Sequence, residues 1–298
     1  MERTPGTVIY IAGYGRSGST LLDLVLGNHT EVRGGGELMY LLDEFRHPER
    51  RCACQQPYAT CEFWAPIVRE FAAADDALRA QLLHVDQRRG FVRKWFSLRR
   101  GGGAEHDAYR GFQRALFTAM TRGGARFVVD SSKSARDAAF RPVALRRVAG
   151  LDVRVLHLVR SPFRVMRSVL KQSNWQAEGY RRAPRLRVLH ALPGWVLANV
   201  LAWLAGFAVG RRNYLRVGYQ ELVDRPDAVL RRIGAFLRID TSRLEKMARE
   251  GAAFRSGHQA GGNRLRMKPE VVIARQRAGV GKEDEEKVGD DLQLKARP

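Results

Sequence analysis

The chain alternates between short apolar runs and longer amphipathic stretches, a pattern that predicts strands followed by helices. The run Val8–Ala12 gives way to glycines and hydroxyls over residues 13–20, and an apolar periodic segment begins directly afterwards at Leu21. That order is typical of a strand, a loop and a helix. Three further strands are predicted, each ending in a polar or charged turn, at residues 126–130, 153–159 and 214–217.

Helical periodicity fills the intervals between these strands. The expected helices cover 66–122 with an interruption at Gly101–Gly103, 137–149, the residues directly after Pro162, and 226–238. Strands that alternate with helices indicate a parallel sheet with crossover connections. We therefore expect an α/β fold, a three-layer sandwich whose central parallel sheet is flanked by helices. One domain is expected over 1–270, followed by a polar, flexible tail over 271–298.

The loop at residues 13–20 has the composition of an anion-binding site. Its glycines let the backbone approach an anion, its hydroxyls donate hydrogen bonds, and the next helix aims its N-terminus at the same point. The predicted contacts are Gly15, Arg16, Ser17, Gly18, Ser19 and Thr20. The spacing fits the nucleotide-binding pattern G-x-x-x-x-G-K-[ST], except that Ser19 replaces the lysine. A P-loop kinase that uses ATP needs that lysine on the phosphates, so it is kept only as an alternative.

Charged residues also follow the other strands. Glu37 comes after the turn Gly34–Gly36, Lys133 follows the strand at 126–130, and Arg160 ends the strand at 153–159. In parallel sheets, ligands collect beyond the carboxyl ends of the strands. We therefore expect the turns after the strands at 8–12, 126–130 and 153–159 to face one common site.

Together these stretches resemble the sulfotransferases that use 3′-phosphoadenosine 5′-phosphosulfate (PAPS), in particular bacterial members, with similarity to tyrosyl-protein sulfotransferases. The resemblance runs from residue 7 to about 268 and includes Tyr219–Pro226, Gly257–Arg266 and the cysteine-containing stretch Cys52–Trp64. It implies a P-loop-like fold, PAPS as co-substrate, and transfer of the sulfuryl group to a hydroxyl or amine of an acceptor. No metal is expected for this chemistry, because fixed cations neutralise the developing charge.

The resemblance also implies how the nucleotide is bound. The loop at 15–20 would hold the 5′-phosphosulfate, and Arg160 together with Ser168 would bind the 3′-phosphate. Asn263 and Arg266 belong to a late loop that would close over the nucleotide. Charge-assisted hydrogen bonds to phosphate contribute roughly 1.5–3 kcal/mol each, enough to distinguish PAPS from nucleotides without a 3′-phosphate.

Three residues are the candidates for catalysis. Glu37 is expected to be the general base, because it occupies the position at which tyrosyl-protein and several bacterial sulfotransferases carry a catalytic glutamate. Lys133 and Arg16 are expected to stabilise the transition state. His29 and His157 are competing bases, but His29 lies at an expected helix end and His157 inside an expected strand, where it would be packed.

The composition adds a strong positive charge. The formal net charge is +21, and only eight of the 52 basic residues are lysine. The arginines are spread along the chain, so the surface would attract anions of many kinds. A basic nucleic-acid-binding protein is therefore a second alternative, but the chain lacks a zinc-finger, RNP or helix-turn-helix signature, and no specific nucleic-acid partner is expected. A catalytically silent member of the PAPS-binding fold is a third alternative.

The most apolar run covers residues 192–209 and has arginines on both sides. It is near the minimum length for a membrane span, but Pro193, Gly194 and Asn199 favour a core or interfacial helix. Peripheral membrane contact through 192–209 is left open. The run motivates an amphipathic acceptor, such as a glycolipid, as well as a small-molecule one.

The cysteines and the N-terminal residues indicate the cellular compartment in which the protein is expected. No apolar leader precedes the first strand, so we expect no secretory signal and a cytoplasmic protein, with membrane association left open. Cys52, Cys54 and Cys61 are the three cysteines of the chain, and an odd number indicates a reducing compartment. The Cys-x-Cys pair and its third cysteine lack a well-spaced fourth zinc ligand, so we expect structural thiols and no metal site.

Overall fold

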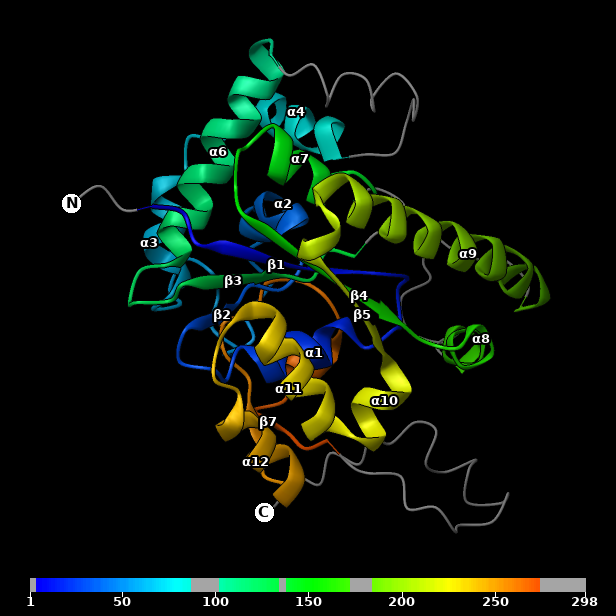
Figure 1. Cartoon of the computed structure of the whole chain (residues 1–298). Helices are drawn as coiled ribbons and strands as arrows, with labels where there is room; N and C mark the ends of the chain where they lie inside the picture. Colours follow the sequence, from blue (N-terminus) through cyan, green and yellow to red (C-terminus); the bar gives the residue numbers. More distant parts are fainter. Residues whose placement is uncertain (1–3, 87–101, 134–137, 172–183, 274–298) are drawn as a thin grey trace.

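A parallel sheet of five strands forms the centre of the molecule, in the order β2-β3-β1-β4-β5 (Figure 1). The computed structural model describes residues 4–86, 102–133, 138–171 and 184–273. The strands are β1 (Thr7–Ala12), β2 (Val32–Gly34), β3 (Phe127–Asp130), β4 (Val153–Val159) and β5 (Tyr214–Gly218). Neighbouring strands pair parallel throughout this sheet. The order places the carboxyl end of β1, where the glycine-rich loop begins, between the ends of β3 and β4.

Helices cover both faces of the sheet. Successive strand residues point to opposite faces, and apolar residues occur at both sets of positions, so both faces must be buried. Val8 and Tyr10 of β1 belong to one hydrophobic core, and Ile9 and Ile11 belong to the other. All four are fully buried, and burying a large aliphatic side chain contributes about 1.5–3 kcal/mol. This arrangement confirms the predicted three-layer α/β sandwich of P-loop-like type.

The helices divide between the two layers as Figure 1 shows. The first layer contains α2 (Leu41–Arg46), α3 (Trp64–Glu70), α4 (Asp76–Asp86), α6 (Ala104–Met120), α7 (Arg141–Arg147) and part of α9 (Pro184–Val209). The second layer contains α1 (Ser19–Leu26), α10 (Tyr219–Asp224), α11 (Pro226–Leu237) and α12 (Ser242–Glu250). The short turns η1 (Leu38–Tyr40) and η2 (Arg211–Asn213) precede α2 and β5, and α8 (Pro162–Lys171) follows β4.

Two predicted helices differ from the observed ones. The helical stretch expected over 66–122 is broken between α3 and α4 as well as before α6, because the side chain of Asp75 accepts a hydrogen bond from the Leu78 amide at 2.8 Å and starts a new helix. Residues 87–101 lie outside the described part of the chain. The helix expected over 137–149 is shorter, since α7 begins at Arg141 with a proline in its first turn, a preferred starting position.

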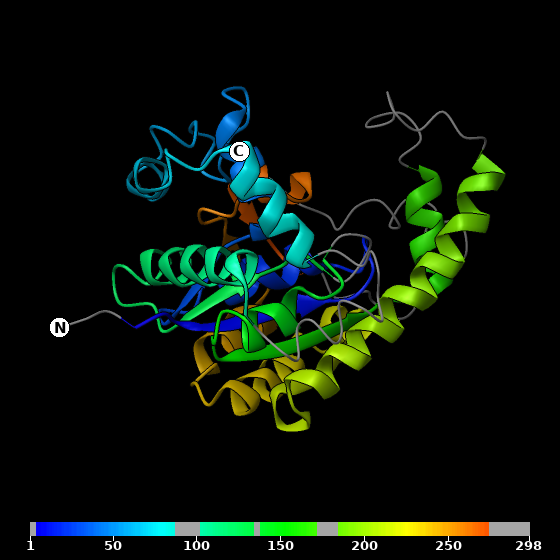
Figure 2. The ribbon, with the colours of Figure 1, turned by 90° about the horizontal axis from the view of Figure 1, so that it is seen from above.

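Helix α9 carries the apolar run at residues 192–209. Figure 2 shows it extending past the edge of the sheet, where it packs beside α8. Its inner side chains, such as Leu201 and Ala205, are buried, whereas Trp203 and Phe207 on the other side are exposed by 50% and 46%. Leu192–Val209 is long and apolar enough to cross a membrane, and about one third of it is buried within the protein. One side of this segment therefore packs in the core, and the rest lies at the surface.

The end of the described chain returns to the sheet. Two short antiparallel strands, β6 (Phe254–Arg255) and β7 (Glu270–Val271), flank the turn η3 (Arg264–Met267), and η3 packs on α1. The late loop predicted at 257–266 therefore lies beside the helix that follows the glycine-rich loop. The tail expected over 271–298 falls outside the described residues after position 273.

Candidate active site

The carboxyl ends of four neighbouring strands bring the predicted charged residues together. Glu37 follows β2, Lys133 follows β3, Arg16 follows β1 and Arg160 follows β4. Lys133 Nζ forms an ion pair with Glu37 Oε1, and Arg160 Nη1 donates to the carbonyl oxygen of Arg16 at 2.9 Å. Burial lowers the pKa of Arg16, and the nearby Glu37 carboxylate opposes that shift. The turns therefore face a common site, as the sequence indicated.

The glycine-rich loop is held tightly on one side and open on the other. A Cβ on Gly13 would lie 2.4 Å from the carbonyl oxygen of Leu158, and one on Gly18 would lie 2.3 Å from the Tyr219 ring. A Cβ on Gly15 would meet nothing within 4 Å. Arg16 adopts a left-handed conformation with φ +69°, which is strained for a side-chain-bearing residue.

Ser17 and the start of α1 offer hydrogen-bond donors to an anion at this loop. Ser17 is only 2% exposed, yet its Oγ has no hydrogen-bond partner among the described residues. Helix α1 begins after Gly18 with no side-chain cap, so amides of its first turn lack one source of partners. Buried polar groups usually have partners. An oxyanion bound at this loop would accept hydrogen bonds from the Ser17 hydroxyl and from the amides of the first turn of α1.

The turn that carries Glu37 is fixed by three other segments. The Glu37 amide donates to Ala260 O at 2.8 Å, the Gly36 amide donates to Asp23 Oδ2 at 2.9 Å, and Gly36 O accepts from the Ser131 amide at 2.7 Å. Burial raises the pKa of Asp23 to about 7. The glutamate is thus presented from a turn whose backbone is bonded to α1, to the loop after β3 and to the late loop.

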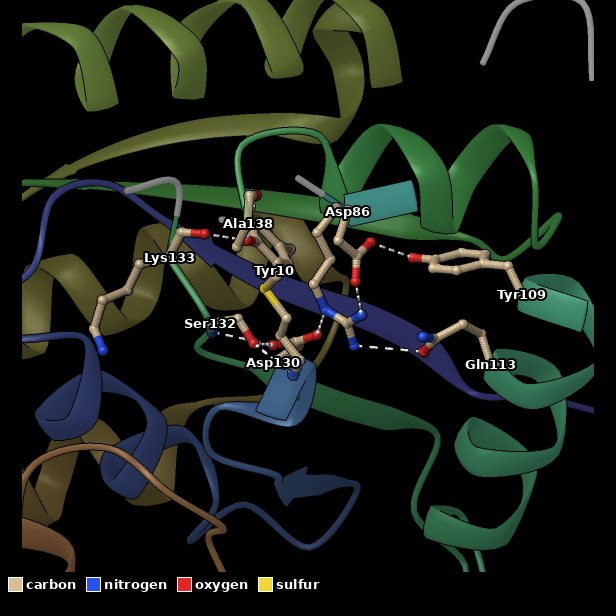
Figure 3. Close-up of polar contacts among 10 residues, drawn as sticks. Tyr10, Asp86, Tyr109, Gln113, Asp130, Ser132, Lys133 and Ala138 are labelled. Atoms are coloured by element: carbon tan, nitrogen blue, oxygen red, sulfur yellow. Dashed lines mark hydrogen bonds and ion pairs between the residues drawn. The ribbon is translucent and has the colours of Figure 1, made fainter. Parts of the chain in front are cut away.

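The loop that presents Lys133 is anchored by a buried polar network, drawn in Figure 3. Asp130 accepts from the Ser132 amide at 3.0 Å, and Ser132 Oγ accepts from the Met39 amide at 3.1 Å. Lys133 adopts φ +70°, and its carbonyl accepts a hydrogen bond from the Tyr10 hydroxyl. The Lys133 loop and the segment after Glu37 are therefore linked through Ser132.

Arg141 is fully buried and joins two carboxylates of the same network, Asp86 and Asp130, which Figure 3 labels. Its Nε lies 2.7 Å from Asp130 Oδ2, and its Nη1 lies 2.7 Å from Asp86 Oδ2. Tyr109 donates to the other Asp86 oxygen at 2.6 Å. Burial raises the pKa of Asp86, and the Arg141 charge opposes that shift. One cation therefore neutralises two carboxylates beneath the site.

Arg160 contacts Tyr219 and Trp195 in addition to the carbonyl oxygen of Arg16. Its guanidinium lies 4.4 Å from the centre of the Tyr219 ring, and its carbonyl accepts from Trp195 Nε1 at 2.9 Å. Burial lowers its pKa, while its Nε has no hydrogen-bond partner among the described residues. Ser168 lies two turns further on, in α8. The roles of this pair toward a 3′-phosphate stay predictions.

The late loop lies near the site, but Asn263 and Arg266 make hydrogen bonds within the protein that stabilise the loop itself. Asn263 Oδ1 accepts from the Leu265 amide at 3.0 Å and caps η3. Arg266 Nη1 donates to Arg51 O at 2.8 Å, and its buried Nε has no partner within the described chain. Contacts of Asn263 and Arg266 with a nucleotide stay predictions.

The two competing histidines are engaged elsewhere. His157 is buried, with Nδ1 2.7 Å from the Tyr214 hydroxyl and Nε2 2.8 Å from Asn199 Oδ1. Burial lowers its pKa. His29 Nε2 lies 2.9 Å from Asp240 O, at the start of α12. His157 is therefore packed, as expected from its place in a strand.

An open cavity of about 430 Å³ adjoins Glu37, within the size range of small-molecule sites. Its walls come from α2, the following loop, α4 and the late loop, and it is lined by Glu37, Tyr40, Asp43, Glu44, His47, Arg50, Arg79, Gly261 and Gly262. A polar molecule in this cavity would lie next to the Glu37 carboxylate. The sequence did not point to this cavity, because its lining comes from three segments far apart in the chain, residues 37–50, Arg79 and residues 261–262.

Sequence reasoning also missed the residues that support the site. Asp23 is a charged residue on the buried face of α1, between Leu22 and Leu24, and a carboxylate in such an apolar run is a usable signal for a buried polar role. The partners of Arg141 could not be found in this way, since Asp86 and Asp130 are 55 and 11 residues away from it.

Comparison with known proteins gives one family match and several similar solved structures. A sequence profile described as the sulfotransferase family matches residues 8–243. A sulfotransferase domain from the curacin biosynthetic pathway superposes with a TM-score of 0.50 at 17% identity, covering 90% of this chain and 84% of that domain. A sulfotransferase from Mycobacterium tuberculosis has a TM-score of 0.49 at 16% identity, covering 82% of this chain and 71% of that one. A search of curated protein sequences gives no significant match.

Proposed function

The chain belongs to the sulfotransferase family, and from that premise we propose that it uses PAPS as its donor and transfers the sulfuryl group to a hydroxyl or amine. The observation that supports this donor most directly is the set of anion-binding groups around the loop after β1. Ser17 Oγ and Arg160 Nε are buried without partners in the described chain, and Gly15 leaves open space. These groups fit two phosphate-like anions on one nucleotide.

In this proposal the donor supplies an activated sulfuryl group, and the protein supplies position, charge and a base. Backbone amides of the loop and α1, with the hydroxyls of Ser17, Ser19 and Thr20, hold the 5′ end. Arg160 and Ser168 hold the 3′-phosphate. Fixed donors and cations of this kind need no rearrangement when charge develops, which is why they accelerate group transfer.

Glu37 takes the proton from the acceptor atom as that atom bonds to sulfur. The bond from sulfur to the 5′-phosphate oxygen of the donor breaks in the same transfer, which releases 3′-phosphoadenosine 5′-phosphate. The Glu37 carboxylate borders the cavity in which an acceptor can bind, and its backbone is bonded at 2.8 Å to Ala260 O. Lys133, paired with Glu37, and Arg16 lie within reach of a group that binds beside the glutamate. They would neutralise the oxygens of the transferred sulfuryl group.

The acceptor is proposed to be amphipathic. The cavity beside Glu37 is lined by charged side chains and suits a polar group. Helix α9 exposes an apolar stripe that includes Val196, Val200 and Trp203, and a Cβ on Gly194 of the same helix would lie 3.3 Å from Tyr14 in the glycine-rich loop. An apolar part of the acceptor, or a membrane surface, could lie along this stripe. Co-sedimentation with anionic vesicles, lost in Trp203→Ser, would support this; acceptor turnover unchanged in that variant would contradict it.

The donor proposal is tested by calorimetric titration with 3′-phosphoadenosine 5′-phosphate, in parallel with AMP and with ATP–Mg²⁺. We expect binding that requires the 3′-phosphate and weakens by about 10- to 150-fold in Arg160→Ala, the equivalent of one charge-assisted hydrogen bond. Arg154→Ala is the matched control, because Arg154 lies on the same strand and pairs with Asp152. Binding of ATP–Mg²⁺ in place of the bisphosphate would favour a kinase and refute the proposal. Equal binding of arbitrary DNA would favour the nucleic-acid alternative.

A further inference from the structure

The three cysteines converge with a histidine from the far end of the described chain. Cys54 Sγ lies 3.6 Å from Cys61 Sγ. His258 Nδ1 lies 3.3 Å from Cys61 Sγ and 3.7 Å from Cys52 Sγ. The four candidate ligand atoms all lie within 4.8 Å of one another. The sequence spacing gave no fourth ligand, because His258 follows Cys61 by 197 residues and only the fold brings it there.

These separations match the edges of a small tetrahedron. A tetrahedral zinc ion with Zn–S bonds of about 2.3 Å and Zn–N bonds of about 2.0–2.1 Å holds sulfur atoms about 3.8 Å apart, and sulfur and nitrogen about 3.6 Å apart. Three thiolates and one imidazole are a common ligand set of structural zinc sites. We propose that Cys52, Cys54, Cys61 and His258 bind one zinc ion.

The local backbone prepares the three sulfur atoms for this role. The Cys52 amide donates to Gln56 O at 3.0 Å, and Gln55 turns the chain with φ +69°. Cys61 lies just before α3, and the amides of Phe63 and Trp64 donate to its sulfur; the Cys54 amide donates to the sulfur of Cys52. Amide hydrogen bonds to ligand atoms orient and stabilise metal ligands.

The imidazole is held in place from two directions. The ring of His258 stacks on Phe63 with a centroid separation of 5.3 Å and an interplanar angle of 23°. The backbone carbonyl of His258 accepts a hydrogen bond from Trp64 Nε1 at 2.6 Å, and Trp64 is fully buried. These contacts direct Nδ1 toward the cysteines. The three cysteines form no disulfide with one another in the structure.

Zinc binding forms three Zn–S bonds and one Zn–N bond, and each thiol releases its proton to the solvent. All four positions are then filled by protein, which is typical of a structural ion rather than a catalytic one. The ion would tie the cysteine loop to the late loop. Two residues after His258, Ala260 accepts from the Glu37 amide and donates to Gly35 O at 2.9 Å. The ion therefore stabilises the turn that presents Glu37.

The experiment measures zinc in the full chain, produced with added zinc and purified under reducing conditions. Wild type is expected to hold roughly one ion per chain, released by a mercurial thiol reagent. After exchange, cobalt should give the intense visible absorption of a tetrahedral thiolate site. His258→Gln should hold well under half as much zinc, whereas the matched control His84→Gln, whose side chain is 63% exposed, should equal wild type.

Three results would overturn the proposal. The first is folded wild type that contains no zinc and shows no thiolate absorption with cobalt. The second is zinc content in His258→Gln equal to that of wild type, which would exclude the histidine as a ligand. The third is a Cys54–Cys61 disulfide, found by mass spectrometry, in the protein purified with reductant. If His258→Gln fails to fold, Cys54→Ser replaces it, since Cys54 is the least buried of the three thiols. None of these results depends on whether the protein uses PAPS.

Discussion

Replacement of Arg141 by methionine should destabilise the protein strongly, because it leaves two buried carboxylates without their shared cation. Both ion pairs of Arg141 measure 2.7 Å, and the exposed fractions of Arg141, Asp86 and Asp130 are 0%, 2% and 0%. Removing one partner of a buried pair destabilises by about 3–5 kcal/mol. For a domain of this size we expect Tm to fall by roughly 6–20 °C.

The loss should depend on pH. In the unfolded chain aspartates titrate near about 3.9, whereas burial already raises the pKa of Asp86 in the folded protein with Arg141 present. Without Arg141 the folded state binds more protons than the unfolded state over the range between these pKa values. The stability of Arg141→Met relative to wild type should therefore fall as pH rises from 5 to 8.

Urea unfolding of both proteins across that pH range is the assay, and Lys246→Met is the matched control. Lys246 and Glu250 form an exposed i,i+4 pair with exposed fractions of 68% and 59%, so its loss should change stability by less than about 1 kcal/mol. If Arg141→Met costs no more than this control, or if its loss is the same at pH 5 and pH 8, the account of the network is wrong.

Three further changes test the site. Glu37→Gln should lower turnover by about 10²–10⁴-fold with nucleotide affinity nearly intact if Glu37 is the base; equal losses of affinity and turnover in steady-state kinetics and calorimetry would mark it as structural. Gly18→Ala should lower nucleotide affinity by at least about tenfold, since φ is +92° and the new Cβ would lie 2.3 Å from Tyr219. The control is Gly111→Ala, whose new Cβ would have no neighbour within 4 Å. Equal affinities of the two variants in calorimetry would contradict the prediction. Burial raises the pKa of Asp23 to about 7 in the folded protein. As the pH rises from 5 to 8, the free energy of unfolding of wild type should therefore fall by roughly 2–3 kcal/mol relative to that of Asp23→Asn. Parallel pH profiles in urea unfolding would show that Asp23 does not titrate in this range.

Local patterns were enough to predict four of the five strands of the sheet and the places where they end, whereas the three-residue strand β2 was not predicted. The run at Val8–Ala12 is apolar on alternate faces because the strand is buried on both sides, and the charged residues after the strands mark the edge at which a ligand can bind. Arg16, Lys133 and Arg160 were placed at that edge for this reason, and Glu37 was expected from the family resemblance; their convergence is a consequence of parallel topology. The helix break at Asp75 was missed, although its capping aspartate was a readable signal.

Long-range pairings could not be predicted from local patterns. Arg141 neutralises Asp86 across 55 residues, and a single sequence contains nothing that relates the two. His258 was expected to belong to the late loop and the cysteines to be structural thiols, because zinc spacing rules apply within one segment, whereas these four residues come from two. The cavity beside Glu37 was missed for the same reason, since its walls come from segments that only the fold assembles.

The bond between Glu37 and Ala260 has a consequence for synthesis of the protein in the cell. These residues lie more than two hundred positions apart, so the turn at Glu37 leaves the ribosome long before its partner exists. At about 5–20 residues per second, the delay is roughly 10–45 s. During that interval β1 can pair with β3 and then with β4, but the turn at Glu37 lacks the backbone hydrogen bond to Ala260. A chain that stops before Ala260 would therefore contain the complete central sheet while the turn at Glu37 is still without this bond.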